Sequence, residues 1–302
     1  MLVQLPDAVA ILSKMVSIDA VSLREPPTEL LGWFRDKSIL VVGGFMEFVC
    51  IEGTALIDED WLRENSNADD ALLRAVAVSE LGDALEKALM LTDLSAPGCI
   101  DTIGGALLSE GRFMNVFREK GTHVRLGFPE TGDPWPRLET FDLTRVAMWA
   151  HKLGFDCRSL AESRVDRALA AYTHVVGLTW QNDGEVLFRA MQGLEAFYID
   201  GTGDLRRQLS SKIQLWLEPW PNNKNVVGQL YDLRSAFVHG SSRLTYWKRE
   251  GGAWDEDEKH MQGFENHVDL AVRLLVATLQ KCIARDVTTI DWSYAYQTNG
   301  KR

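Results

Sequence analysis

The sequence predicts a mainly α-helical protein, in which an N-terminal α+β domain precedes a C-terminal helical bundle. The first observation is length: the chain has 302 residues, more than one domain commonly holds, so two domains are expected. The second is a break at 129–136, where three prolines and a glycine fall within eight residues and disfavour regular structure. The third is the helical spacing of apolar residues after this break. We place the domains at 1–155 and 156–302.

Before the break, the pattern mixes strands with helix. Short runs rich in β-branched and aromatic residues, punctuated by glycines, predict strands. A segment that opens with two aspartates and continues with leucine and alanine at helical spacing predicts a helix. The expected elements are strands at 38–42 and 46–51, a helix from 69 to about 91, and further short strands between 99 and 126.

After the break, the chain changes to almost continuous helix. The separators between the apolar stripes are short and rich in glycine, proline and asparagine, and connections this short favour antiparallel neighbours. The stripes are expected to form the core of a bundle rather than to line a cofactor. Helices are expected at 142–153, 160–180, 183–199, 204–218, 225–240 and 259–285.

The composition is that of an ordinary globular protein, with 46% hydrophobic and 25% charged residues. No apolar run approaches the roughly 20 residues of a membrane span, and the N-terminus has no signal-peptide pattern. The four cysteines are scattered and form no C-x-x-C pair, so a structural zinc site is not expected. We expect a cytoplasmic protein with reduced thiols, no membrane association, no metal site and no cofactor.

The distribution of charge bears on which partners the chain can bind. The net charge of −11 argues against broad, nonspecific binding of nucleic acid. The segment 156–250, however, contains 12 basic and 11 acidic residues, so the acidity lies elsewhere in the chain. A local basic groove is therefore compatible with this segment.

The most informative residues of that segment are Arg234 and His239, which Gly240 follows at once. Imidazole can transfer a proton near neutral pH, and a guanidinium can hold a phosphate through two parallel hydrogen bonds. Residues five positions apart on a regular helix point about 140° away from each other. A helix that ends at His239, or a symmetric dimer, can bring the two groups together. By spacing alone, an ion pair and a helix-capping histidine explain them as well.

The surrounding sequence resembles the HEPN family, and in particular the Apea-like HEPN domains of bacterial defence proteins. Residues 193–198, GLEAFY, are similar to the acidic helix motif of the family. Residues 230–240, LYDLRSAFVHG, are similar to its R-x4-6-H signature, and a long apolar final helix follows after an insert. The resemblance covers about 160–285.

This resemblance implies a helical bundle that forms a homodimer and acts as a metal-independent endoribonuclease on tRNA or mRNA, in antiphage defence or growth arrest. It implies that Arg234 and His239 are catalytic and that Glu195 is a supporting acid. Ser241 stands where some members carry a tyrosine that a partner nucleotidyltransferase modifies, so that mode of control is in doubt.

A basic and aromatic segment after the motif is a candidate RNA-binding site, since cations hold phosphates and aromatic rings stack on unpaired bases. A solvated loop explains the same residues. The candidates are Arg243, Tyr246, Trp247, Lys248 and Arg249.

Other functions remain open from the sequence. A noncatalytic HEPN adaptor that dimerises or docks a partner also fits the acidic net charge, and so does a small-ligand sensor. The N-terminal domain is expected to bind a trigger or a regulatory partner, or to choose the RNA.

Overall fold

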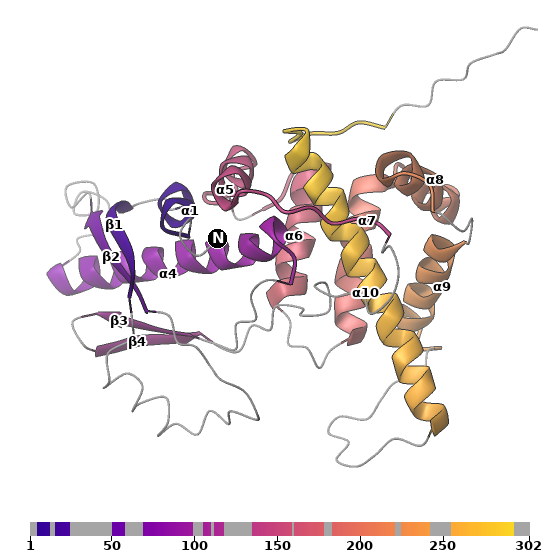
Figure 1. The fold of residues 1–302 in the computed structure, drawn as a ribbon, viewed down its shortest axis with the longest axis horizontal. Coiled ribbons are helices and arrows are strands. Elements are labelled where there is room, and N and C mark those ends of the chain that lie inside the picture. Colours follow the sequence, from indigo (N-terminus) through magenta and orange to yellow (C-terminus); the bar gives the residue numbers. More distant parts are fainter. Residues whose placement is uncertain are drawn as a thin grey trace, which may run out of the picture. The chain divides into compact units, whose positions relative to one another are not determined.

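The computed structural model is mainly helical (Figure 1). It describes residues 5–12, 16–24, 50–57, 69–98, 105–109, 112–117, 135–158, 160–177, 183–220, 225–241 and 255–292. The chain divides into two compact units, Met1–Leu89 and Met90–Arg302. Within the described ranges, no helix combines the length and the apolar composition that a bilayer span requires.

The first unit contains α1 (Leu5–Leu12) and two antiparallel strands, β1 (Val16–Arg24) and β2 (Cys50–Ile57), with an irregular register between Ile18 and Ala20. The strand expected at 38–42 lies outside the described residues, as does most of the one expected at 46–51. The predicted helix is confirmed: α4 is Asp70–Ser95 and continues past the division between the units. The N-terminal α+β domain as a whole stays a prediction.

In the second unit, the end of α4 is followed by a hairpin of β3 (Gly105–Ser109) and β4 (Arg112–Phe117), two short strands in the predicted range. The six predicted helices follow and are confirmed within a few residues. They are α5 (Leu143–Lys152), α6 (Arg164–Gly177), α7 (Asp183–Tyr198), α8 (Leu205–Leu217), α9 (Val226–Val238) and α10 (Asp255–Ala284). The starts of two helices differ most from the prediction, each by four residues: α6 begins later than expected and α10 earlier. The first turn of α10 includes the acidic run 255–258, because carboxylates favour the first turn of a helix.

The core of this unit lies among α6, α7 and α10, whose inward side chains are almost completely buried. Its few buried polar groups are paired. Tyr198 and Thr278 share a hydrogen bond of 2.8 Å between their hydroxyls. The amide of Gln280 donates to the carbonyls of Leu94 and Glu139 and accepts from the Glu139 N–H. Gln280 therefore joins α10 to the end of α4 and to the segment before α5.

The helix α5 packs against the end of α10. The sequence places this helix before the boundary at residue 155, whereas in the structure it packs with the later helices. Arg145 donates to the carbonyls of Ile283 and Ala284 at the end of α10, and the indole of Trp149 donates to Val287. The Trp149 side chain is buried in this contact, so packing at α10 holds the helix in the second unit. The boundary after 155 stays a prediction.

Gly193 allows α7 to lie close to both neighbours in the core. A Cβ built on it would lie 2.9 Å from Ala171 Cβ of α6 and 2.9 Å from Leu275 Cδ1 of α10. These distances are shorter than carbon atoms tolerate, so a side chain here would force the helices apart.

Replacing Gly193 with alanine should therefore lower the free energy of unfolding by about 1–2 kcal/mol, because overpacking outweighs the gain in helix propensity. Gly263 is the matched control, since it also lies within a helix but a Cβ there would meet no atom within 4 Å. Gly263→Ala should raise stability by roughly 0.5–1 kcal/mol. Denaturant unfolding of both variants measures whether each change lowers or raises the free energy of unfolding. A Gly193→Ala protein as stable as Gly263→Ala would contradict the close packing.

Candidate functional site

His239 occupies a well-defined helix end. The N–H of Gly240 donates to Phe237 and the N–H of Ser241 donates to Ala236, at 3.2 and 2.9 Å. This is the Schellman arrangement, which satisfies the last carbonyls of a helix. It requires a left-handed residue just past the cap, and Gly240 has φ +71°. The predicted end of the helix at His239 is confirmed: His239 is the C-cap of α9.

Phe237, near the C-terminal end of α9, packs this helix against the start of α7. A Cβ built on Gly184 would lie 2.1 Å from Cε2 of Phe237, so the Phe237 ring rests directly on the glycine backbone. The His239 side chain is exposed, and no hydrogen bond or ion pair to its imidazole is found within the described ranges. His239 is thus open to solvent at the end of a fixed helix.

Arg234 extends from α9 to α7. Its Nη2 lies 3.2 Å from Oε2 of Glu195, and the two side chains are 23% and 22% exposed. Its guanidinium also lies 5.7 Å from the ring centroid of Phe188 on the same helix, a distance at which a cation and an aromatic ring attract each other. The structure therefore brings together two of the three predicted catalytic residues, Arg234 and Glu195.

The ion pair leaves some of its own hydrogen-bonding capacity unused. Nε of Arg234 and Oε1 of Glu195 are buried and have no hydrogen-bond partner among the described residues. Buried polar atoms of this kind are uncommon in proteins and often mark functional positions. The pair is consequently a partly satisfied polar cluster against a bundle core, rather than a saturated surface salt bridge.

Burial also changes the acidity of this cluster. Removal from water raises the pKa of Glu195 above its usual value near 4.5, and the neighbouring Arg234 charge opposes that rise only in part. The direction is unusual for a carboxylate in an ion pair, and it agrees with the small exposed fraction of both side chains.

The raised pKa predicts how Glu195 affects stability with pH. The folded protein binds the Glu195 proton more tightly than the unfolded chain, so Glu195 makes stability fall as pH rises from the ordinary carboxyl pKa through the raised one. Glu195→Gln should remove this contribution, which is at most about 1.4 kcal/mol per pH unit. Denaturant unfolding across pH 4–7 measures the slope. Glu185→Gln, a more exposed carboxyl on α7, is the control. Equal slopes in wild type and Glu195→Gln would contradict the shift.

Phe188 is a residue of the site that the sequence analysis did not single out. It lies seven positions before Glu195, so the two share one face of α7. The seven-residue spacing of Phe188 and Glu195 could have indicated that the two lie together. An aromatic residue on a helix face is, however, ordinarily explained by core packing. Only the position of the Arg234 guanidinium gives the ring a further role.

The remaining predicted site residues cannot be placed. The candidates for RNA binding are Arg243, Tyr246, Trp247, Lys248 and Arg249, and all of them lie outside the described residues. Their role stays a prediction.

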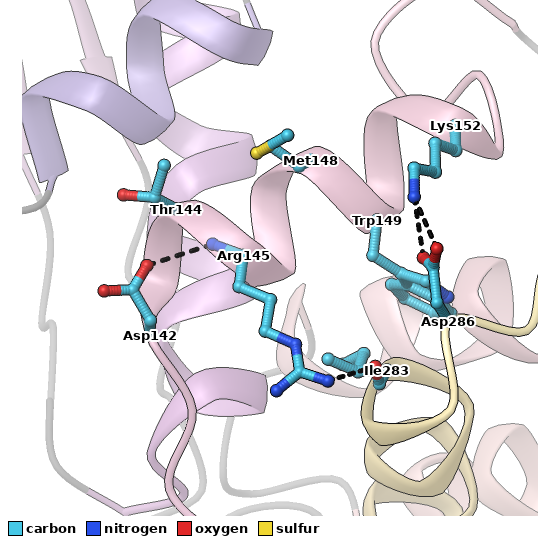
Figure 2. Close-up of a pocket in the computed structure, with 8 residues that line it drawn as sticks. All are labelled: Asp142, Thr144, Arg145, Met148, Trp149, Lys152, Ile283 and Asp286. Atoms are coloured by element: carbon cyan, nitrogen blue, oxygen red, sulfur yellow. Dashed lines mark hydrogen bonds and ion pairs between the residues drawn. The ribbon is translucent and has the colours of Figure 1, made fainter.

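A pocket of about 420 Å³ lies elsewhere, between α5 and the end of α10 (Figure 2). Its charged side chains already have protein partners: Lys152 binds Asp286 at 2.6 Å, and Arg145 donates to two carbonyls at the end of α10. Neither Arg234 nor His239 lines it. We assign the pocket no chemistry. It is lined by Asp142, Thr144, Arg145, Met148, Trp149, Lys152, Ile283 and Asp286.

Comparisons with protein-family models, with curated proteins and with solved structures found no significant match.

Proposed function

We propose that this protein is a metal-independent endoribonuclease of the HEPN type. The observation that supports this most is the end of α9, where an exposed histidine follows an arginine that a partly buried glutamate holds. His239 supplies a group that transfers protons near neutral pH. Arg234 supplies a guanidinium that stabilises charge on a phosphate.

The proposed reaction is cleavage by the 2′-hydroxyl of the RNA itself. The 2′-oxygen attacks the adjacent phosphorus, and the bond from phosphorus to the 5′-oxygen of the next nucleotide breaks. The products carry a 2′,3′-cyclic phosphate and a 5′-hydroxyl. His239 accepts the proton of the 2′-hydroxyl or donates one to the leaving oxygen, and Arg234 stabilises the charge on the phosphoryl oxygens.

The proposal includes a homodimer. In one chain Arg234 turns toward α7 while His239 stands at the exposed end of α9, and no hydrogen bond joins them among the described residues. A second copy related by two-fold symmetry can bring two such helix ends to one cleft. The second histidine then provides the complementary proton transfer. Antiphage defence or growth arrest is the setting that the family resemblance implies, with the N-terminal part answering a trigger or a regulatory partner.

A noncatalytic adaptor is the second candidate, and a specific observation favours it. The Arg234 guanidinium is occupied by Glu195, and most of its surface is covered. In an adaptor, this pair serves only to join α7 and α9. The two candidates differ in whether Arg234 can also reach a phosphate.

Cleavage of tRNA and mRNA in EDTA tests the proposal. The expected result is cutting with 2′,3′-cyclic phosphate and 5′-hydroxyl ends. Products with a 3′-hydroxyl and a 5′-phosphate would contradict the proposed chemistry, because attack by the 2′-oxygen cannot form them. A homogeneous protein that cuts neither RNA would favour the adaptor.

A further inference from the structure

After α10, the residues up to Trp292 bond to α5, to the residue before α6 and to the end of α7. Asp286 has φ +54°, and the N–H of Val287 donates to the carbonyl of Cys282 at 2.8 Å, which closes α10. The following residues then bond to neighbouring elements: Trp149 donates to Val287 at 2.9 Å, and Ser163 donates to Thr288 at 3.3 Å. We name residues 286–292 the C-terminal strap.

Trp292 places its indole at the C-terminal end of α7. Its Nε1 donates to the carbonyl of Phe197 at 2.8 Å. The last four carbonyls of a helix have no partner within the helix unless the chain continues the ladder or a side chain caps them. Just past this point Arg164 caps the carbonyl of Ile199 and pairs with Asp200 at 2.8 Å. Side chains from other elements therefore hold the end of α7.

The ring of Trp292 is held by its surroundings. It packs on Phe197, Tyr198 and Trp216, with centroids 5.6–6.2 Å away. On another side lies the ammonium group of Lys212, 5.4 Å from the ring. Lys212 is almost fully buried. The aromatic cluster and the buried cation together fix the indole that donates to α7.

Glu195 belongs to the turn of α7 that Trp292 caps. Its carbonyl accepts the N–H of Ile199 at 2.9 Å, and Phe197 lies between these two residues. The Glu195 carboxylate is the group that holds Arg234. A loss of order in this turn would move the carboxylate, and the Arg234 guanidinium would lose its partner.

We propose that Trp292 is a positioning residue, which fixes the last turn of α7 and thereby holds Glu195 against Arg234. The consequence for catalysis rests on the proposed ribonuclease function, whereas the positioning itself does not. The C-terminal strap would then help to orient the Arg234 side chain through Glu195. None of the bonds described above joins the strap to Arg234 or His239.

Trp292→Phe in the full-length protein is the test, because it removes the N–H donor and keeps an aromatic ring in the cluster, although a smaller one. Trp216→Phe is the matched control, since this indole belongs to the same cluster but donates to Thr278 of α10 at 3.4 Å. The first readout is solvent exchange of the Arg234 Nη–H protons by NMR, assigned with Arg234→Lys, because Nη2 makes the bond to Glu195. Exchange should be faster in Trp292→Phe by a factor of roughly 2–10, which corresponds to the free energy of one neutral hydrogen bond. Trp216→Phe should match wild type.

The second readout is RNA cleavage. Trp292→Phe should lower it by a factor of roughly 2–10, and Trp292→Phe should cause no further loss in a Glu195→Gln background, because both changes act through one group. Unchanged Arg234 exchange in Trp292→Phe would overturn the proposal, whether or not the wild type cuts RNA. Faster Arg234 exchange in Trp292→Phe, found together with a wild-type protein that cuts no RNA, would support positioning by Trp292 and count against the ribonuclease.

Discussion

His239→Ala should lower RNA cleavage about 10²–10⁴-fold, the contribution of a positioned general acid or base. The physical reason is that water replaces a proton-transfer group held close to the scissile bond. The fold should survive the change, because the side chain is exposed and has no partner among the described residues. The Schellman bonds at this position come from the backbone, so alanine retains them.

The measurement is single-turnover cleavage in EDTA, with circular dichroism to confirm that the helices persist. His174→Ala is the matched control, because His174 is an exposed histidine on a helix of the same unit. It should cleave as wild type does. If His239→Ala also cleaves at the wild-type rate, His239 is not the proton-transfer group, and the proposed site is wrong.

Arg234→Ala should lower cleavage about 10²–10³-fold, the usual effect of removing one donor that stabilises charge in a transition state. Arg234→Lys should recover only part of this loss, because an ammonium cannot make the two parallel hydrogen bonds of a guanidinium. The Arg234→Ala protein should also be less stable, since the partly buried Glu195 is left without its partner.

Arg206→Ala is the control that distinguishes a catalytic role of the Arg234 charge from the structural effect of losing an ion pair on α9. Arg206 on α8 pairs with Asp232 of α9 at 3.0 Å, so this change also removes an arginine contact that joins α9 to a neighbour. We expect cleavage close to wild type in Arg206→Ala. Equal losses in Arg206→Ala and Arg234→Ala would mean that the placement of α9 matters rather than the Arg234 charge, which fits the adaptor better.

The helices of the second unit were predictable because their signals are local. Apolar spacing located all six, and Gly240 located the end of α9, where a left-handed residue completes the cap. The last helix was expected to begin at residue 259, and the structure begins α10 at Asp255. The favourable interaction of carboxylates with a helix N-terminus extends such a helix by a few residues, and periodicity alone misses this turn.

The candidate site was predictable only as separate residues. Glu195, Arg234 and His239 came from motifs, but spacing along α9 says nothing about where a long side chain turns. In the structure Arg234 turns to Glu195 and Phe188 on another helix. Its direction depends on how α7 and α9 pack, and the close contact of Phe237 with Gly184 is part of that packing.

What the sequence by itself determined about this protein is therefore its helices, their ends and the identity of the candidate residues, because these depend on neighbours within a few positions. Only the tertiary structure decided that Glu195 meets an arginine 39 positions away, and that Trp292 closes the end of α7 from 95 positions away. Such contacts arise from the packing of helices distant in the chain, and a local pattern carries no information about which distant backbone or side chain will lie beside it.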